Sequence, residues 1–308
     1  MSRVVVAGAS GMIGTALSAA LRGQGVETVR LVRRMPEGPD ERSWDPAAGT
    51  LSPQDLSGAD AVVNLAGRSI AGLWTARARD EIMRSRVQAT RLLVDAVAKA
   101  PVPPAVLVSA SAIGYYGDRG EEVLTEGSPP GRGFLADVTR AWEAEAERAT
   151  ASGARVVRTR FGLILARQGG LMRILIPLFR LGLGGPVGSG RQWWSWVHLD
   201  DVIAAIVTAI RTAAVVGPVN VVAPQAVTNR EFARTLGAVL RRPALLPAPA
   251  FALRLMMGQM AEEMILAGQR VTPAKLLEQG FVFKWPALSG ALEEITGRGR
   301  GTRDASGR

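Results

Sequence analysis

Hydroxyl-bearing side chains gather in the stretch Ser109–Gly117, which has the sequence SASAIGYYG and follows an apolar run. The stretch contains both tyrosines of the chain, Tyr115 and Tyr116, together with Ser109 and Ser111. A phenol can donate or accept a proton, and a serine hydroxyl can hydrogen-bond to an oxygen of a substrate. The cluster therefore predicts a reaction centre, provided that other segments hold a cofactor and supply a charge that adjusts the tyrosine pKa.

A glycine-rich turn near the start of the chain predicts a nucleotide site. Gly8, Gly11 and Gly14 lie between the predicted strand Arg3–Gly8 and the predicted helix Met12–Arg22. In such a turn the first glycine permits the tight bend, the second lets a pyrophosphate approach, and the third lets the helix pack on the sheet. Unpaired N–H groups at the helix start then face the phosphates. The predicted contacts at this turn also include Ser10, Met12 and Ile13.

Two arginines indicate which dinucleotide is bound. An NAD site usually carries an acidic residue at the end of the second strand, where it binds the ribose 2′-OH. Here the predicted strand Thr28–Val32 is followed by Arg33 and Arg34, and we expect no acid to compete for them. Two guanidinium groups attract a 2′-phosphate, so the pattern favours NADP(H) over NAD(H).

The elements that must position these residues alternate between apolar strands and helices. Continuous apolar strands separated by helices predict an α/β fold, a Rossmann-type doubly wound parallel sheet buried on both faces. Further predicted strands are Ala61–Gly67, Ala105–Ser111, Arg155–Leu165 and Val219–Ala223, and further predicted helices are Thr75–Ala98 and Leu135–Thr150.

The pattern changes after residue 165. We expect residues 1–165 to form the NADP(H)-binding domain, completed by a strand near 218–223, and residues 166–297 to form mostly a smaller substrate-capping region. Residues 298–308 are expected to be a disordered tail. A capping box, Thr228–Glu231, predicts a helix start. Leu245–Gly268 holds methionines at near-helical spacing, which predicts a helix that buries a soft apolar face.

With this glycine spacing, the NLAG segment Asn64–Gly67 and the SASAIGYYG stretch, the chain resembles the extended short-chain dehydrogenase/reductase superfamily. In detail it is similar to an NAD-dependent epimerase/dehydratase-related family. The similarity runs through Asn64–Val97, Arg180–Val202, Asn220–Pro243 and Val271–Leu292. It implies a Rossmann-type fold, NADP(H) binding and a cytoplasmic protein, with Asn64, Ala66 and Gly67 near the cofactor, but it names no substrate.

The superfamily's usual acid–base pair is missing. In the superfamily a serine positions the substrate, and a tyrosine four residues before a lysine transfers the proton; Ser111 matches the serine. The only lysines are Lys99, Lys275 and Lys284, so no Tyr-x-x-x-Lys sequence exists. By position, Phe134 and Val138 stand where the pair belongs.

Three functional hypotheses follow. In the first, the protein is an atypical NADP(H)-dependent oxidoreductase or epimerase-like enzyme acting on a small carbonyl or hydroxyl substrate. Ser111 orients that substrate, Tyr115 or Tyr116 supplies the proton, and an arginine such as Arg140, Arg160 or Arg191 lowers the tyrosine pKa. In the second, the protein binds NADP(H) without catalysis, as a sensor or scaffold. The third is nucleic-acid binding, which the sequence disfavours because it lacks a basic helix interleaved with aromatics.

Other candidate residues have simpler expected roles. Arg160 lies on a strand whose end faces the cofactor, so we expect it to be buried against an acid or a phosphate. Arg191 and Trp193 follow a glycine-rich loop and are expected to line the substrate cleft. His198 is expected to be structural, and the acids of Glu121–Glu126 to lie in a solvated loop.

Composition limits the remaining possibilities. The chain has 308 residues, a net charge of +10, no cysteine and one histidine, which excludes disulfides, thiolate metal ligands and a histidine-rich metal site. No stretch is long and apolar enough to cross a bilayer, and the glycines that interrupt Val4–Leu21 argue against a signal peptide. We therefore expect a soluble, cytoplasmic protein without a metal, and we leave a homodimer open.

Overall fold

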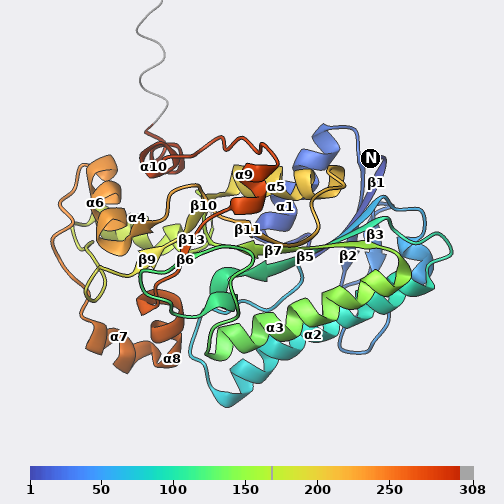
Figure 1. Cartoon of the computed structure of the whole chain (residues 1–308), viewed down its shortest axis with the longest axis horizontal. Helices are drawn as coiled ribbons and strands as arrows, with labels where there is room; N and C mark the ends of the chain where they lie inside the picture. Colours follow the sequence, from blue (N-terminus) through green and yellow to red (C-terminus); the bar gives the residue numbers. More distant parts are fainter. Residues whose placement is uncertain (168, 299–308) are drawn as a thin grey trace, which may run out of the picture.

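The computed structural model describes residues 1–167 and 169–298. Its centre is a seven-stranded sheet in the order β11-β7-β5-β4-β1-β2-β3 (Figure 1), and every neighbouring pair is parallel. The strands are β1 (Arg3–Ala7), β2 (Glu27–Val32), β3 (Glu41–Ser43), β4 (Ala61–Asn64), β5 (Val106–Ala112), β7 (Arg155–Phe161) and β11 (Gly217–Val221). The predicted α/β, Rossmann-type doubly wound sheet is confirmed. Residues 299–308 of the expected tail lie outside the described residues.

The strand order reverses between β1 and β4. From β1 the chain builds outward through β2 and β3, and then returns to place β4, β5, β7 and β11 on the other side. In open α/β sheets, ligands bind at the carboxyl ends of the strands where the order reverses. The loops after β1 and β4 meet there, and the Leu65 N–H donates to the Ala7 carbonyl at 2.9 Å.

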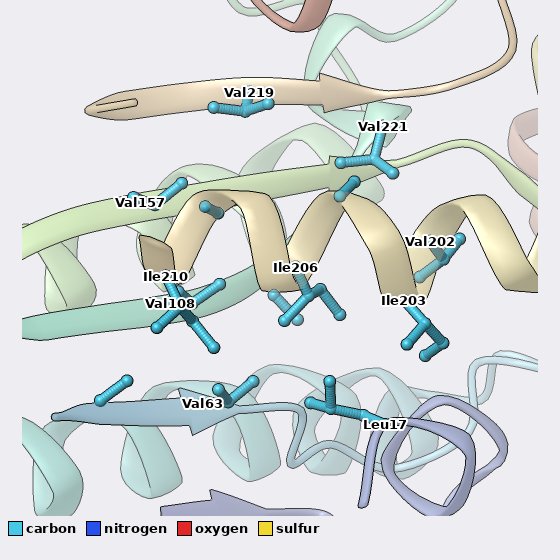
Figure 2. Close-up of a cluster of buried hydrophobic side chains, with 14 of the residues drawn as sticks. Leu17, Val63, Val108, Val157, Val202, Ile203, Ile206, Ile210, Val219 and Val221 are labelled. Atoms are coloured by element: carbon cyan, nitrogen blue, oxygen red, sulfur yellow. The ribbon is translucent and has the colours of Figure 1, made fainter. Parts of the chain in front are cut away.

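Helices cover both faces of the sheet. α2 (Ala76–Lys99) and α3 (Phe134–Glu147) lie side by side on one face, and α1 (Met12–Gly23) and α5 (Leu199–Arg211) lie on the other (Figure 1). Alternate strand residues face opposite helix layers because side chains alternate along a strand. Figure 2 shows Ile203, Ile206 and Ile210 of α5 over the valines of the sheet. Burial of both faces explains the continuous apolar strands of the sequence.

The later part of the chain builds a smaller region with its own apolar core, which includes Met172, Trp196 and Phe232. Thr228 caps the helix α6 (Asn229–Leu240) by accepting a hydrogen bond from the Glu231 N–H at 3.2 Å, as the capping box predicts. The other elements are α4 (Met172–Arg180), β8 (Leu163–Leu165), β9 (Trp193–Trp194), β10 (Trp196–His198), β12 (Val227–Thr228), α6 (Asn229–Leu240), β13 (Arg270–Val271), α9 (Ala274–Glu278) and α10 (Leu288–Thr296). β6 (Val123–Leu124) pairs with β13.

The predicted strand Arg155–Leu165 is two strands. It breaks at Gly162, after which β8 leaves the main sheet and pairs with β10. A Cβ atom at Gly162 would stand 2.4 Å from the Ser195 carbonyl oxygen, so only glycine permits this close crossing. The expectation of one continuous strand was wrong because apolar character does not show which sheet a residue joins.

The predicted helix within Leu245–Gly268 is also interrupted. It comprises α7 (Ala250–Met257), α8 (Gln259–Ala261) and a π-helical turn (Glu262–Leu266), with a break at Gly258, whose φ is 56°. α7 buries none of its residues, and Leu255 is 87% exposed. The expected burial of a soft face was therefore wrong for α7, because helical spacing of apolar residues does not supply a neighbour to pack against.

Candidate active site

The three glycines of the turn differ in what an added side chain would meet. The packing of the chain requires glycine at Gly8 and Gly14, whereas Gly11 has space beside it. A Cβ at Gly8 would stand 2.6 Å from the Leu65 carbonyl oxygen, and one at Gly14 would stand 2.3 Å from the Gly8 carbonyl oxygen. Among the described residues other than its chain neighbours, a Cβ at Gly11 would meet only the Gly8 carbonyl oxygen, at 3.4 Å. Gly11 is exposed and caps α1 without a side-chain hydrogen bond. The chain therefore presents an open backbone cradle and a bare helix N-terminus, which together suit a pyrophosphate.

The other residues of the turn surround this cradle. Ser10 is exposed, and Met12 and Ile13 are half-buried at the start of α1. All three lie at the carboxyl end of β1, where the strand order reverses. The arrangement is the strand–turn–helix context that a dinucleotide-binding turn needs.

Arg33 and Arg34 differ in their surroundings. Arg33 is exposed and has no ion pair among residues 1–167 and 169–298. Arg34 donates to both carboxylate oxygens of Glu41 at 2.8 Å and lies 3.1 Å from Glu37. The Glu41 hydrogen bond raises the pKa of Arg34. The expectation that no acid competes was wrong for Arg34, because Glu41 lies on β3, an edge strand that the sequence did not predict.

Asn64 shapes the loop after β4. Its Nδ2 donates to the Thr90 hydroxyl at 2.8 Å, and its Oδ1 accepts a hydrogen bond from the Ala66 N–H at 3.2 Å. Asn64 is fully buried, whereas Gly67 at the end of the loop is exposed. Asn64 thus ties the loop to α2 and leaves Ala66 and Gly67 beside the point where the strand order reverses.

Ser111 belongs to a buried polar network. Its hydroxyl donates to Glu143 Oε1 at 2.6 Å, and Ser111 itself is 2% exposed. Glu143 projects from the buried face of α3, and its two oxygens accept hydrogen bonds from Arg160 Nε and Nη2, both at 2.8 Å. Arg160 is therefore buried against an acid, as expected. Glu143 was not predicted, although a glutamate among the apolar residues of one helix face was a usable signal.

The two tyrosines have different environments. Tyr116 is fully buried; its hydroxyl donates to Asn220 Oδ1 at 2.6 Å and accepts from Arg160 Nη1 at 2.9 Å. Burial raises the pKa of Tyr116, and Arg160 opposes that shift. Tyr115 is half-buried, and within the described part of the chain its hydroxyl makes no hydrogen bond. The Arg160 guanidinium carbon lies 3.5 Å from the Tyr115 ring centroid.

Only one of the three arginines proposed as partners contacts a tyrosine. Arg140 is exposed and pairs with Asp137, and Arg191 is exposed without a side-chain partner among residues 1–167 and 169–298. Arg160 contacts both tyrosine rings. The structure thus brings Arg160, Tyr115 and Tyr116 together and leaves the other two arginines apart.

The positions that correspond to the missing pair carry apolar side chains in the structure. Phe134 packs edge-on against Trp74, with ring centroids 5.0 Å apart, and Val138 is buried. A carboxylate from the later region caps α3 here. Glu263 accepts hydrogen bonds from the Phe134 and Leu135 N–H groups at 2.9 and 2.8 Å. This contact was not predicted, because its partners are separated by more than a hundred residues.

Trp193 is fixed by contacts within the chain. Its indole N–H donates to Glu121 at 2.6 Å, and the Arg270 guanidinium lies 4.4 Å from its ring centroid.

Glu126 is not solvated, contrary to expectation. It is 7% exposed, and its Oε1 accepts hydrogen bonds from the Asn220 and Lys275 N–H groups at 3.0 and 3.2 Å. The expectation failed because the later region covers the loop that contains Glu126.

His198 has a structural environment. Its Nδ1 accepts a hydrogen bond from the Asp200 N–H at 3.1 Å and so caps α5, while Nε2 lies 3.1 Å from Glu294.

Among residues 1–167 and 169–298, no helix has the length and apolarity to span a membrane, and no cluster of three acidic or histidine side chains could hold a metal ion.

Comparison with known proteins places these features in a family. A family model described as "NAD dependent epimerase/dehydratase family" matches residues 4–223, and a model for a domain of unknown function, DUF1731, matches residues 248–295. The chain is 42% identical to epimerase family protein Mb2239 of Mycobacterium bovis over 296 residues, covering 96% of this chain and 98% of that protein. It is 40% identical to human epimerase family protein SDR39U1, covering 95% of this chain and 99% of that protein.

A solved structure supports the same assignment. The crystal structure of human epimerase family protein SDR39U1 (isoform 2) with NADPH matches with a TM-score of 0.88 and 38% identity, covering 96% of this chain and 99% of that chain. The glycine turn, the strand order and the family match over most of the sheet agree with one another. This chain therefore belongs to the NAD-dependent epimerase/dehydratase family.

Proposed function

We propose that this protein binds NADP(H) at the glycine turn and acts as an atypical oxidoreductase or epimerase-like enzyme on a small carbonyl or hydroxyl substrate. The open cradle at Gly11 carries the proposal, because no described residue packs so closely against this position that it requires a glycine. The exposed guanidinium of Arg33 suits the 2′-phosphate. The NADPH in the human relative's structure agrees with this choice of cofactor.

Tyr115 is the residue that we assign to proton transfer. When bound, the nicotinamide would supply or accept a hydride. The Tyr115 hydroxyl is not committed to another described residue, and the guanidinium carbon of Arg160 lies 3.5 Å from its ring centroid. A cation at the ring face stabilises negative charge on the phenol, which assists release of its proton to a carbonyl oxygen. Arg160 thus takes the part that the missing lysine would play.

Ser111 and Tyr116 then act as positioning residues. The Ser111 hydroxyl proton is directed to Glu143, and the Tyr116 hydroxyl is held between Asn220 and Arg160. Both side chains are buried, and both hydroxyls are hydrogen-bonded within the chain. Together they fix the orientation of the Arg160 guanidinium under the Tyr115 ring.

The test is a comparison of Tyr115→Phe with the wild type. Tryptophan quenching would measure NADPH and NADH binding, and nicotinamide absorbance would follow turnover of a panel of carbonyl substrates. We expect Tyr115→Phe to bind NADPH normally and to lose about 10²-fold or more of its turnover, as is typical when a general acid is removed. Tyr116→Phe removes a contact that positions Arg160 but keeps the Tyr115 hydroxyl, so it should lose less turnover than Tyr115→Phe. Normal turnover by Tyr115→Phe would refute the assignment.

A second candidate function is a non-catalytic NADP(H)-binding sensor or scaffold. Phe134 and Val138 at the place of the usual pair, and the internal hydrogen bond of Ser111, support this alternative. Tight NADPH binding with no turnover across the panel, in the wild type as well as in Tyr115→Phe, would favour it.

The proposal also includes the domain organisation, the substrate cleft, the location and the oligomeric state. We assign residues 1–165, with the strand near 218–223, to the cofactor-binding domain, and residues 166–297 mostly to the region that caps the substrate. Arg191 and Trp193 are proposed to line the substrate cleft from that region. A cytoplasmic location agrees with the absence of cysteine. A homodimer would be tested by light scattering.

A further inference from the structure

The helix α4 of the later region has an apolar face that is exposed. Three of its apolar residues are buried in the core of this region, namely Met172, Ile176 and Phe179. Ile174, Leu178 and Leu181 follow at the spacing i, i+4 and i+7, so they lie along the opposite side of the helix. All three are exposed, and Leu181 is 74% exposed. A helix that is apolar on both sides is normally buried, so the exposed side of α4 suits a partner.

The exposed side of α4 continues into two loops that lie side by side. Arg242 Nε donates to the Arg180 carbonyl at 3.0 Å, and the Leu246 N–H donates to the Gly184 carbonyl at 3.3 Å. The exposed apolar side chains of these two loops are Leu183, Leu245 and Leu246. Leucines from two distant segments thus join the exposed row of α4.

α7 extends the same surface. A Cβ atom at Gly188, later in the first of these loops, would stand 3.5 Å from the Cβ of Ala250 at the start of α7. Phe251 and Leu255 of α7 are exposed. Figure 1 shows α4 and α7 at the same end of the molecule, away from β3. We call the exposed residues of α4, the two loops and α7 the α4–α7 surface.

The α4–α7 surface carries arginines and no acidic residue of its own. The sequence has no aspartate or glutamate from 148 to 199 or from 232 to 261, and these two stretches supply the whole surface. Its exposed arginines are Arg173, Arg180, Arg241, Arg242 and Arg254. Among residues 1–167 and 169–298, only Arg254 of this set forms an ion pair, with Glu262. Exposed apolar side chains are thus combined with a net positive charge.

The charge decides which partner suits this surface. In a two-fold dimer the surface would face itself, so arginines would meet arginines without a carboxylate between them. An anionic bilayer supplies both complementary properties, because acyl chains accept the apolar side chains and negative headgroups attract arginine. We propose that the α4–α7 surface attaches the protein to an anionic lipid membrane. Such attachment needs no spanning helix, and it does not depend on the proposed NADP(H) site.

The residue types favour a bilayer over an acidic protein. Tryptophan and tyrosine, together with arginine, dominate binding between proteins, and leucine is under-represented there. Residues 171–190 and 241–257 contain no tryptophan or tyrosine, and their exposed apolar residues are mainly leucines. Leucine and phenylalanine beside arginine are typical of surfaces that lie in a membrane interface.

The first test concerns the apolar contacts. Flotation of the full chain would compare vesicles of phosphatidylcholine alone with vesicles of equimolar phosphatidylcholine and phosphatidylglycerol. We expect the wild type to bind the anionic vesicles, and the double variant Leu181→Gln/Leu245→Gln to bind them at least about tenfold more weakly. Val102→Gln/Val282→Gln is the matched control, because both valines are exposed outside the surface. This control should bind as the wild type does.

The second test concerns the charge. Arg173→Gln/Arg180→Gln should weaken binding to the anionic vesicles about tenfold or more. Arg22→Gln/Arg211→Gln removes the same charge from exposed positions on α1 and α5, and it should weaken binding less than about threefold. Binding by the wild type should be weaker at high ionic strength and on the neutral vesicles, because both reduce the attraction of the arginines.

The third test identifies the part of the protein that meets the lipid. The chain has no cysteine, so Leu181→Cys can be labelled at one site with an environment-sensitive fluorophore. Its emission should shift to the blue when anionic vesicles are added. The same label at Val282→Cys should not shift.

Four results would overturn the proposal. One is the absence of wild-type binding to the anionic vesicles, which would leave the surface to an acidic protein. Another is equal binding by Leu181→Gln/Leu245→Gln and the wild type. A third is an equal shift of the two labels, which would indicate adsorption without orientation. The last is a dimer, seen by light scattering, that is lost in the leucine variant, because it would assign the surface to a second copy of the chain.

Discussion

Replacing Arg33 by alanine should remove most of the preference for NADPH over NADH, whereas Arg34→Ala should change it less. The reason is the difference in their partners. Arg33 is exposed and free to contact a 2′-phosphate, but Arg34 already donates two hydrogen bonds of 2.8 Å to Glu41. A 2′-phosphate would have to compete with that carboxylate for Arg34.

The magnitude follows from the exposure of the contact. A hydrogen bond to a charged group contributes about 1.5–3 kcal/mol, and screening by solvent reduces this at the surface. We therefore expect Arg33→Ala to weaken NADPH binding by about 1–2 kcal/mol, a factor of roughly 5–30, and NADH binding hardly at all. For Arg34→Ala the factor should stay below about three.

Tryptophan quenching with NADPH and NADH measures both affinities for the wild type, each single variant and the double variant. The loss of NADPH affinity in Arg33→Ala should shrink at high ionic strength, because salt screens an exposed charge pair. An equal loss for both nucleotides, or a larger selective loss in Arg34→Ala than in Arg33→Ala, would refute the reasoning.

Three further predictions concern the glycine turn and the buried network. Gly11→Ala should weaken NADPH binding without lowering the unfolding temperature. Gly14→Ala should lower the unfolding temperature, because the added Cβ would stand 2.3 Å from the Gly8 carbonyl oxygen. Calorimetry with and without NADPH measures both effects for each variant. The raised pKa of Tyr116 means that above pH ~10 the unfolded chain loses a proton that the folded chain keeps, so the free energy of unfolding falls as pH rises past ~10. In the Tyr115→Phe variant Tyr116 is the one tyrosine left, so the phenolate absorbance reports its ionisation alone. This absorbance should appear only when the protein unfolds, and its appearance in folded protein near pH ~10 would contradict the prediction. Glu143→Gln leaves a buried arginine uncompensated and should cost about 3–5 kcal/mol in urea unfolding, so a loss below about 1 kcal/mol would count against it.

Local patterns in the sequence were sufficient to predict the main sheet and the cofactor turn. The apolar strands and the glycine spacing depend on neighbours in the chain, so the strand–turn–helix unit around Gly11 was predictable. The capping box at Thr228 was predictable for the same reason. The absence of a Tyr-x-x-x-Lys pair needed only counting, and it directed attention to the arginines.

The chemistry of each candidate residue depended on contacts between distant segments. Tyr115 and Tyr116 are adjacent in sequence, yet only Tyr116 is buried, because Asn220 of β11 and Arg160 of β7 meet its hydroxyl. Arg33 and Arg34 are likewise adjacent, and only Arg34 meets Glu41 of β3.

The sequence by itself determined the alternation of the main apolar strands with helices and the turn that suits a dinucleotide. Only the tertiary structure decided which tyrosine is buried and which guanidinium is neutralised by a carboxylate. Hydrogen bonding and desolvation depend on atoms brought together through space, and spacing along the chain does not specify those atoms.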